Sequence, residues 1–209
     1  MVLTPHALRA ASLALLLGAP GCSWFEADQQ AGPSDAAPPE ESGRLAVSAL
    51  AAGDELGTAV AATPDLIAVG APGDDRLASE SGAVHFFMPG ADGWNEAGVL
   101  LADGGRAGDR FGSALALAGD LLAVGAPGRD EDGSYAGAVY VYRRSGGLWE
   151  QAAMLLAPDD HPGDRFGTAV GFVDPDRLAI GASGHDGEQP GAGATYLFQS
   201  QGDTWVPLR

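Results

Sequence analysis

The side chains in this chain that could do chemistry are mostly carboxylates, and they gather in three glycine-containing segments. Two carboxylates that face one cleft can act as general acid and general base, whereas a cluster of about six to eight oxygen ligands can hold calcium. Asp74 and Asp130 are one pair that fits the first chemistry. We expect these acids to form solvated loops, with the two chemistries as the alternatives. The acidic segments are Asp74-Asp75, Asp130-Glu131-Asp132-Gly133, and Asp186 with Glu188.

The D-x-D-G order of the middle segment resembles part of a calcium loop, but its contiguous oxygen ligands are too few for a complete site. We therefore expect no metal and no other cofactor, with calcium as the alternative. The single cysteine excludes an internal disulfide and zinc sites built on several cysteines. Walker, G-x-S-x-G, H-E-x-x-H and G-x-G-x-x-G motifs do not occur in the sequence. The chain is accordingly not expected to be an enzyme, and a hydrolase acting on polysaccharide or lipid is the alternative.

The charge of the chain limits its partners. Of its 209 residues, 28 are acidic and 11 are basic, which gives a formal net charge of −17. Nucleic-acid phosphates and anionic lipid headgroups attract clustered Lys and Arg, so this balance argues against nucleic acid and against a polybasic membrane anchor. With 45% hydrophobic residues the chain can still build a folded core.

Residues 1–21 are predicted to be a secretory signal. Arg9 provides the positive charge, and the apolar run Ala10–Leu17 is shorter than the ~20 residues that span a bilayer. The next segment, Gly18-Ala-Pro-Gly-Cys22, resembles a bacterial lipobox. This resemblance implies cleavage before Cys22, lipid attached to Cys22 and a place in the cell envelope, with Ser23 implying the outer membrane. Ordinary secretion with a free thiol is the alternative.

Residues 22–43 combine Pro, Ala and acidic residues without an apolar period, which is typical of a disordered linker. A linker of this length holds a folded domain clear of the lipid headgroups. The folded domain is therefore predicted to span residues 44–209.

The rest of the chain repeats one unit three times. Each unit holds four short runs of apolar, aromatic and β-branched residues, separated by glycine-containing turns. The units span about 44–98, 99–153 and 154–209, and residues 44–50 are predicted to be the last strand of an earlier unit. In the middle unit the predicted strands are 111–117, 121–124, 137–142 and 148–156. The landmarks with a spacing of 55 or 56 residues are Gly57, Gly112 and Gly167; Trp94, Trp149 and Trp205; and Asp54, Asp109 and Asp164.

The middle unit carries GDRFG, 12 residues, GAPG, a loop, GAVYVY, a turn and Trp149. This order resembles the FG-GAP repeat, which builds the β-propeller of integrin α chains and of many bacterial surface proteins. The first unit has Leu56-Gly57 for Phe-Gly, and the third has Gly181-Ala-Ser for Gly-Ala-Pro. The resemblance covers about residues 44–209. It implies an all-β, β-propeller-like domain of about three four-stranded blades.

Residues that recur in every unit are predicted to serve the fold rather than chemistry. The recurring aspartates are expected to accept backbone N–H groups in turns, with carboxylates converging near the propeller axis as the alternative. The recurring tryptophans are expected to pack blades, with a sugar-stacking surface as the alternative. His85 aligns with Tyr140 and Tyr196, so it is predicted to be a packing position. His161 and His185 fall in loops and have no repeated partners.

Three blades are fewer than the roughly four to eight of a closed propeller. We expect either an open arc or a ring closed by self-association, and an N-terminal strand that completes the last blade is a further way to close it. An open arc exposes an apolar blade face, which favours a homo-oligomer or another partner. The predicted function is therefore that of a lipid-anchored cell-surface protein. It is expected to bind a protein or polysaccharide, or to act as a scaffold, through its propeller loops.

Overall fold

The computed structural model describes residues 43–208 apart from positions 46, 48, 92, 131–134, 160, 188 and 203. Cys22, the predicted signal and the predicted linker up to residue 42 lie outside the described residues. The described chain consists of strands and turns. Within it, no helix is long and apolar enough to cross a membrane.

In the described residues, twelve strands form three separate four-stranded antiparallel sheets, which confirms the predicted fold class. Within each sheet every strand pairs with the next one along the chain. The first sheet has β1 (Val60–Thr63), β2 (Leu66–Ala71), β3 (Ala83–Gly90) and β4 (Gly93–Leu100). The second has β5 (Ala114–Ala118), β6 (Leu121–Ala126), β7 (Ala138–Ser145) and β8 (Leu148–Leu155). The third has β9 (Phe166–Asp174), β10 (Arg177–Ala182), β11 (Ala194–Gln201) and β12 (Thr204–Pro207).

The strand register repeats from sheet to sheet. Gly70 faces Val84 in the first sheet, and Gly125 faces Val139 in the second. At the same place in the third sheet, Gly181 faces Thr195. Because side chains alternate between the two faces of a strand, this shared register gives each sheet the same pair of faces.

Two hydrophobic cores lie between consecutive sheets. The first joins Phe86 of the first sheet to Phe111 and Tyr140 of the second, and the Phe111 and Tyr140 rings meet edge to face with centroids 5.4 Å apart. Trp149 stacks on Phe86 at 5.4 Å, which fits its predicted packing role. The second core repeats the arrangement with Phe166 at the same place as Phe111. The phenylalanine of each Phe-Gly pair therefore anchors its sheet to the preceding one.

Glycine is required where consecutive sheets touch. A Cβ atom on Gly125 would lie 2.0 Å from the carbonyl oxygen of Gly167 in the next sheet, and one on Gly70 would lie 1.9 Å from that of Gly112. Parallel bridges pair the residue before the third strand of one sheet with the Phe of the next sheet, as in Gly82 with Phe111. Backbones at this distance leave no room for a side chain.

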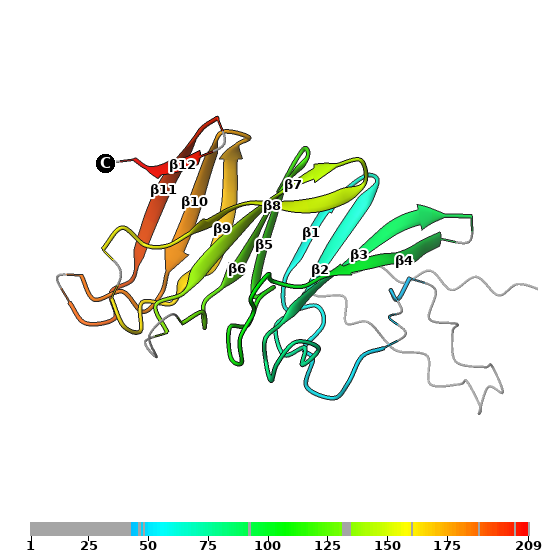
Figure 1. Cartoon of the computed structure of the whole chain (residues 1–209), viewed down its shortest axis with the longest axis horizontal. Helices are drawn as coiled ribbons and strands as arrows, with labels where there is room; N and C mark the ends of the chain where they lie inside the picture. The colour runs from blue at the N-terminus through cyan, green and yellow to red at the C-terminus, as the bar shows by residue number, and fades with distance from the viewer. Residues whose placement is uncertain are drawn as a thin grey trace, which may run out of the picture. The chain divides into compact units, whose positions relative to one another are not determined.

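The three sheets stand side by side in a row, with the first and third at opposite ends (Figure 1). The predicted strand at 44–50 is wrong, because the described residues of that segment form turns and irregular structure. No described N-terminal strand joins the third sheet, whose outer edge is its own β12. On its face that points away from the second sheet, the third sheet carries Arg177 and Thr195. At the same positions the second sheet carries Leu121 and Val139, which pack against the third sheet. These polar replacements make its outer face less apolar than the internal contact faces.

Candidate functional site

The loop before each Phe-Gly or Leu-Gly pair is organised by a buried aspartate. The Oδ2 atom of Asp54 accepts the N–H of Ala51 at 2.6 Å, and that of Asp109 accepts the N–H of Arg106 at 2.8 Å. Asp164 is equally buried in the third repeat. These contacts confirm the turn-forming role predicted for Asp54 and Asp109.

At both contacts between sheets, two residues with left-handed backbone lie opposite each other. Arg110 (φ 56°) donates its N–H to the carbonyl of Glu80 (φ 51°) at 3.0 Å. Arg165 (φ 54°) donates to Tyr135 (φ 50°) at 3.3 Å in the same way. Residues other than glycine enter this region at an energetic cost, and such strain gathers at functional sites. Three of these four residues, Arg110, Tyr135 and Arg165, line one pocket at a rim of the domain.

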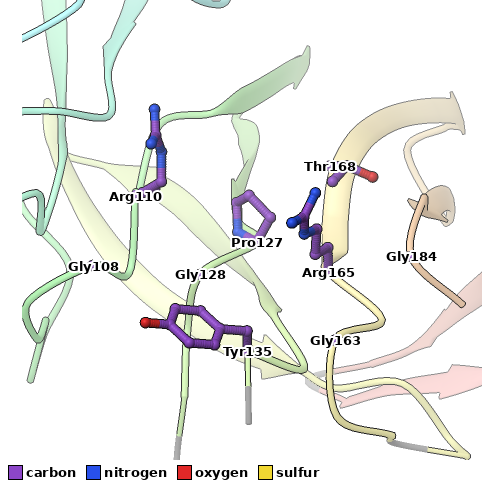
Figure 2. A pocket seen from close by; sticks show the side chains of 9 residues that line it. All are labelled: Gly108, Arg110, Pro127, Gly128, Tyr135, Gly163, Arg165, Thr168 and Gly184. Carbon is purple, nitrogen blue, oxygen red and sulfur yellow. The ribbon is translucent and has the colours of Figure 1, made fainter. Parts of the chain in front are cut away.

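A pocket of about 700 Å³ opens at this rim between the second and third sheets. Arg110, Tyr135 and Arg165 come from the strained positions, Pro127 follows β6, and Thr168 lies in β9. Figure 2 shows the side chain of Arg165 extending toward Pro127. Four glycines complete the lining: Gly108, Gly128, Gly163 and Gly184.

The two arginines of the pocket differ in their partners. Arg110 is paired with Glu55 at 2.7 Å and with Glu80 at 3.3 Å, both from the first sheet's segment. In the described part of the chain, the guanidinium of Arg165 makes no ion pair. The described lining of the pocket contains no carboxylate. A guanidinium with free donors binds carboxylates or other planar anions in bidentate fashion, so this is an anion-accepting position on an acidic protein.

Three of the loop acids, Asp74, Asp75 and Asp186, accept backbone N–H groups within their own loops. Asp75 accepts the N–H of Glu80 at 2.7 Å, and Asp186 accepts the N–H of Gly191 at 2.6 Å across an equivalent loop. Asp74 is 1% exposed and accepts the N–H of Arg76 at 2.9 Å. Asp130 is described, whereas Glu131, Asp132 and Gly133 lie outside the described residues.

His85 is more than the packing residue that its alignment predicts. It is fully buried, its Nδ1 atom lies 3.0 Å from Oε1 of Glu96, and its Nε2 atom lies 3.8 Å from Oδ2 of Asp74. The imidazole therefore sits between two carboxylates. The repeat alignment could not reveal this, because the other sheets have tyrosine at the same place.

Tertiary structure also joins two histidines that the sequence leaves apart. His185 Nδ1 lies 3.0 Å from Oδ2 of Asp164, and His161 Nδ1 lies 4.0 Å from the same oxygen. The hydrogen bond to Asp164 raises the pKa of His185. Alignment of the repeats offers a clue to this pairing, because His161 and His185 stand at the places of Arg106 and Arg129 in the second repeat.

Comparison with known proteins adds one finding about the family. A family model described as FG-GAP repeat matches residues 40–87, 94–142 and 149–198. No curated protein matches the chain in a sequence search.

Proposed function

The chain belongs to the FG-GAP repeat family, and on this basis we propose that it is a non-catalytic binding protein of the bacterial cell envelope. Lipid on Cys22 anchors it, in the outer membrane according to Ser23, and residues 22–43 tether the binding domain to the lipid. The support for the anchor is the lipobox-like segment that ends the predicted signal.

The observation that carries the binding proposal is the guanidinium of Arg165 in a pocket whose described lining holds no carboxylate. Tyr135, 59% exposed, offers an aromatic face in the same pocket. A guanidinium recognises a carboxylate, and an aromatic ring provides a flat apolar surface with a polar tip. A sugar carrying an acid group uses both features. The proposed ligand is therefore an acidic polysaccharide.

An envelope hydrolase is the alternative function. Glycoside hydrolysis needs two carboxylates about 5–9.5 Å apart in one cleft. Asp74 of the suggested pair is buried and hydrogen-bonded to its own loop, which leaves it no access to a substrate. This favours binding over catalysis.

Equilibrium titration of the full-length chain with an oligouronate, followed by intrinsic fluorescence, tests the binding proposal. We expect binding that weakens as salt rises and that falls at least about tenfold in Arg165→Gln. Arg143→Gln is the control, because it removes the same charge from β7 outside the pocket lining. Equal binding of a neutral oligosaccharide of the same length, or equal losses in the two variants, would contradict the proposal.

A scaffolding role through self-association rests on the open end of the third sheet. There a hollow of about 400 Å³ is lined by Gly181, Ala182 and Gly193. In the first and second sheets, the space over the equivalent glycines is filled by the backbone of the next sheet. At the other end of the row, Leu56-Gly57 stands at the place of Phe-Gly, and a Cβ atom on Gly57 would meet nothing within 4 Å. We propose that the Leu56-Gly57 segment of a second copy enters this hollow.

Charge supports the same head-to-tail contact. The contact places Glu55 of one copy beside Arg165 of the next, as Glu55 lies beside Arg110 within one chain at 2.7 Å. Self-association and an acidic ligand would therefore compete for Arg165. Because Arg177 and Thr195 reduce the apolar area of the face, the association is expected to be weaker than the internal contacts. Sedimentation equilibrium over a wide concentration range tests it. A monomer at every concentration would contradict it.

A further inference from the structure

Two of the four histidines in the chain flank one buried aspartate in the third repeat. One nitrogen each from His161 and His185 and one oxygen of Asp164 all lie within 4.8 Å of one another. The Asp164 oxygen is 3.0 Å from His185 Nδ1 and 4.0 Å from His161 Nδ1. A tetrahedral zinc ion with bonds of about 2.0–2.1 Å holds its ligand atoms roughly 3.3 Å apart. The observed separations lie on either side of that value.

Only a small movement is needed to complete this geometry. The side chain of His161 is 65% exposed, so it can turn toward Asp164 without disturbing the core. Asp164 and His185 are held in place by their burial and by their mutual hydrogen bond. Two preset ligands and one mobile one allow a metal to enter from solvent.

The second repeat shows what the same positions do without histidine. There Arg129 Nη1 lies 2.9 Å from Oδ2 of Asp109, and Arg106 stands at the place of His161. A buried carboxylate needs a cation beside it, and the permanently protonated Arg129 supplies one. Arginine keeps its proton and cannot ligate a metal, whereas neutral imidazole can.

In the third repeat, histidine has replaced arginine at both of these positions, so a bound cation can take over the charge that Arg129 carries. We propose that His161, Asp164 and His185 bind a first-row divalent metal ion, with Zn²⁺ as the probe.

A second layer of contacts supports the proposed ligand His185. Its Nε2 atom faces Oδ2 of Asp159 at 3.9 Å, and the hydroxyl of Tyr196 donates to Oδ1 of Asp159 at 2.6 Å. A histidine that binds metal through one nitrogen usually directs its other N–H to a carboxylate, which fixes the ring. In the second repeat the place of Asp159 is taken by Gly104, whose carbonyl accepts from Arg129 at 2.9 Å. The side-chain carboxylate is thus present only where the histidine is.

The donor set determines the class of metal. Two imidazoles and one carboxylate suit zinc and its neighbours, whereas calcium and magnesium prefer oxygen ligands alone. The ion would tie the loop before β9 to the loop after β10, since Asp164 precedes Phe166 and His185 follows Ala182. Its role is structural, and its ligands Asp164 and His185 directly adjoin Gly163, Arg165 and Gly184, which line the anion-accepting pocket.

Isothermal titration of the metal-free full-length chain with Zn²⁺ tests the site. The protein is purified without a polyhistidine tag and carries Cys22→Ser in every sample, so that neither a tag nor a thiol competes. We expect one Zn²⁺ per chain, a higher Tm with Zn²⁺, and no change of Tm with the same concentration of Mg²⁺. His161→Ala should weaken binding at least about tenfold while the metal-free Tm stays unchanged, because this side chain is exposed.

Two further variants separate a ligand role from a folding role. The double variant His161→Arg with His185→Arg recreates the second repeat's residues, so it should fold and bind no Zn²⁺. Asp159→Asn should weaken binding about 10–100-fold without abolishing it, as expected of an orienting group. Arg106→Ala, at the equivalent place in the second repeat, should leave binding unchanged. The proposal is overturned if Zn²⁺ does not bind at millimolar concentration, or if His161→Ala and the double arginine variant bind it as well as the parent.

Discussion

The guanidinium of Arg129 lies 2.9 Å from Oδ2 of Asp109, and both side chains are almost fully shielded from solvent. Asp109 also holds the turn before Phe111 through the N–H of Arg106. A buried carboxylate that organises a turn is stable only with a compensating charge or donor. The third repeat meets the same requirement at Asp164 with His185. One structural need is thus satisfied by different chemistry in two repeats.

Removing the positive charge of Arg129 should strongly destabilise the domain. Arg129→Met keeps most of the side-chain volume but leaves Asp109 buried without its ion pair. We expect the free energy of unfolding to fall by about 3–5 kcal/mol, as measured by urea denaturation followed by tryptophan fluorescence. Adding Asp109→Asn removes the uncompensated charge and should restore part of the loss. A loss below about 1 kcal/mol in Arg129→Met would contradict the buried-pair interpretation.

The same glycine-to-alanine change should cost far more stability at one of two equivalent positions than at the other. Gly125→Ala places a Cβ atom 2.0 Å from the Gly167 carbonyl, so the second and third sheets must separate. We expect a loss of about 3 kcal/mol or more. At Gly181 the nearest atom to a Cβ would be the Ala169 Cβ at 3.3 Å, because no further sheet of the described residues packs there. Gly181→Ala should cost less than about 1 kcal/mol.

Gly181→Ala also probes the proposed self-association. The variant fills the hollow that would receive Leu56-Gly57 of a second copy, so it should shift the sedimentation profile toward monomer while the fold is kept. If Gly125→Ala and Gly181→Ala lowered the free energy of unfolding equally, these glycines would be needed for the backbone conformation of the strand and not for contact between sheets.

The His185–Asp164 pair should make stability depend on pH. The hydrogen bond to Asp164, its largest cause, raises the pKa of His185 above the ordinary 6.5. A raised pKa in the folded state gives stability that is complete below about pH 6.5 and is lost as the pH rises through the folded-state pKa. Urea denaturation with a chelator present, compared between the parent and His185→Gln, measures this contribution. The difference in unfolding free energy should shrink as pH rises; a constant difference would contradict the pair.

Lipid attachment to Cys22 should be visible in growing cells. Metabolic labelling with a palmitate analogue is expected to mark the chain and to be lost in Cys22→Ser, since Cys22 is the only cysteine in the sequence. Ser23→Ala is the neighbouring control, because it leaves the thiol in place and should keep the label. Label that persists in Cys22→Ser would remove the anchor from the proposed function.

The strands were predictable from the sequence more reliably than their ends. The predicted strand at 111–117 exists but begins at Ala114, and Phe111 bridges Gly82 of the preceding sheet. The third strand of the same sheet runs on to Ser145, beyond the predicted end at residue 142. Local patterns record which residues favour extended backbone. They do not record where a neighbouring sheet takes over a strand's hydrogen bonds.

What the sequence by itself determined is the repeated module: four short strands, a buried Phe, close-packed glycines and a turn-forming Asp. A period of 55 or 56 residues in independent landmarks can arise only from one structure used three times. Only the tertiary structure decided which side chains meet between repeats and loops. Arg110 reaches Glu55 across 55 residues, and His185 reaches His161 across the third sheet's first hairpin. Such meetings depend on how sheets stack and loops fold over their edges, and no periodicity along the chain encodes them.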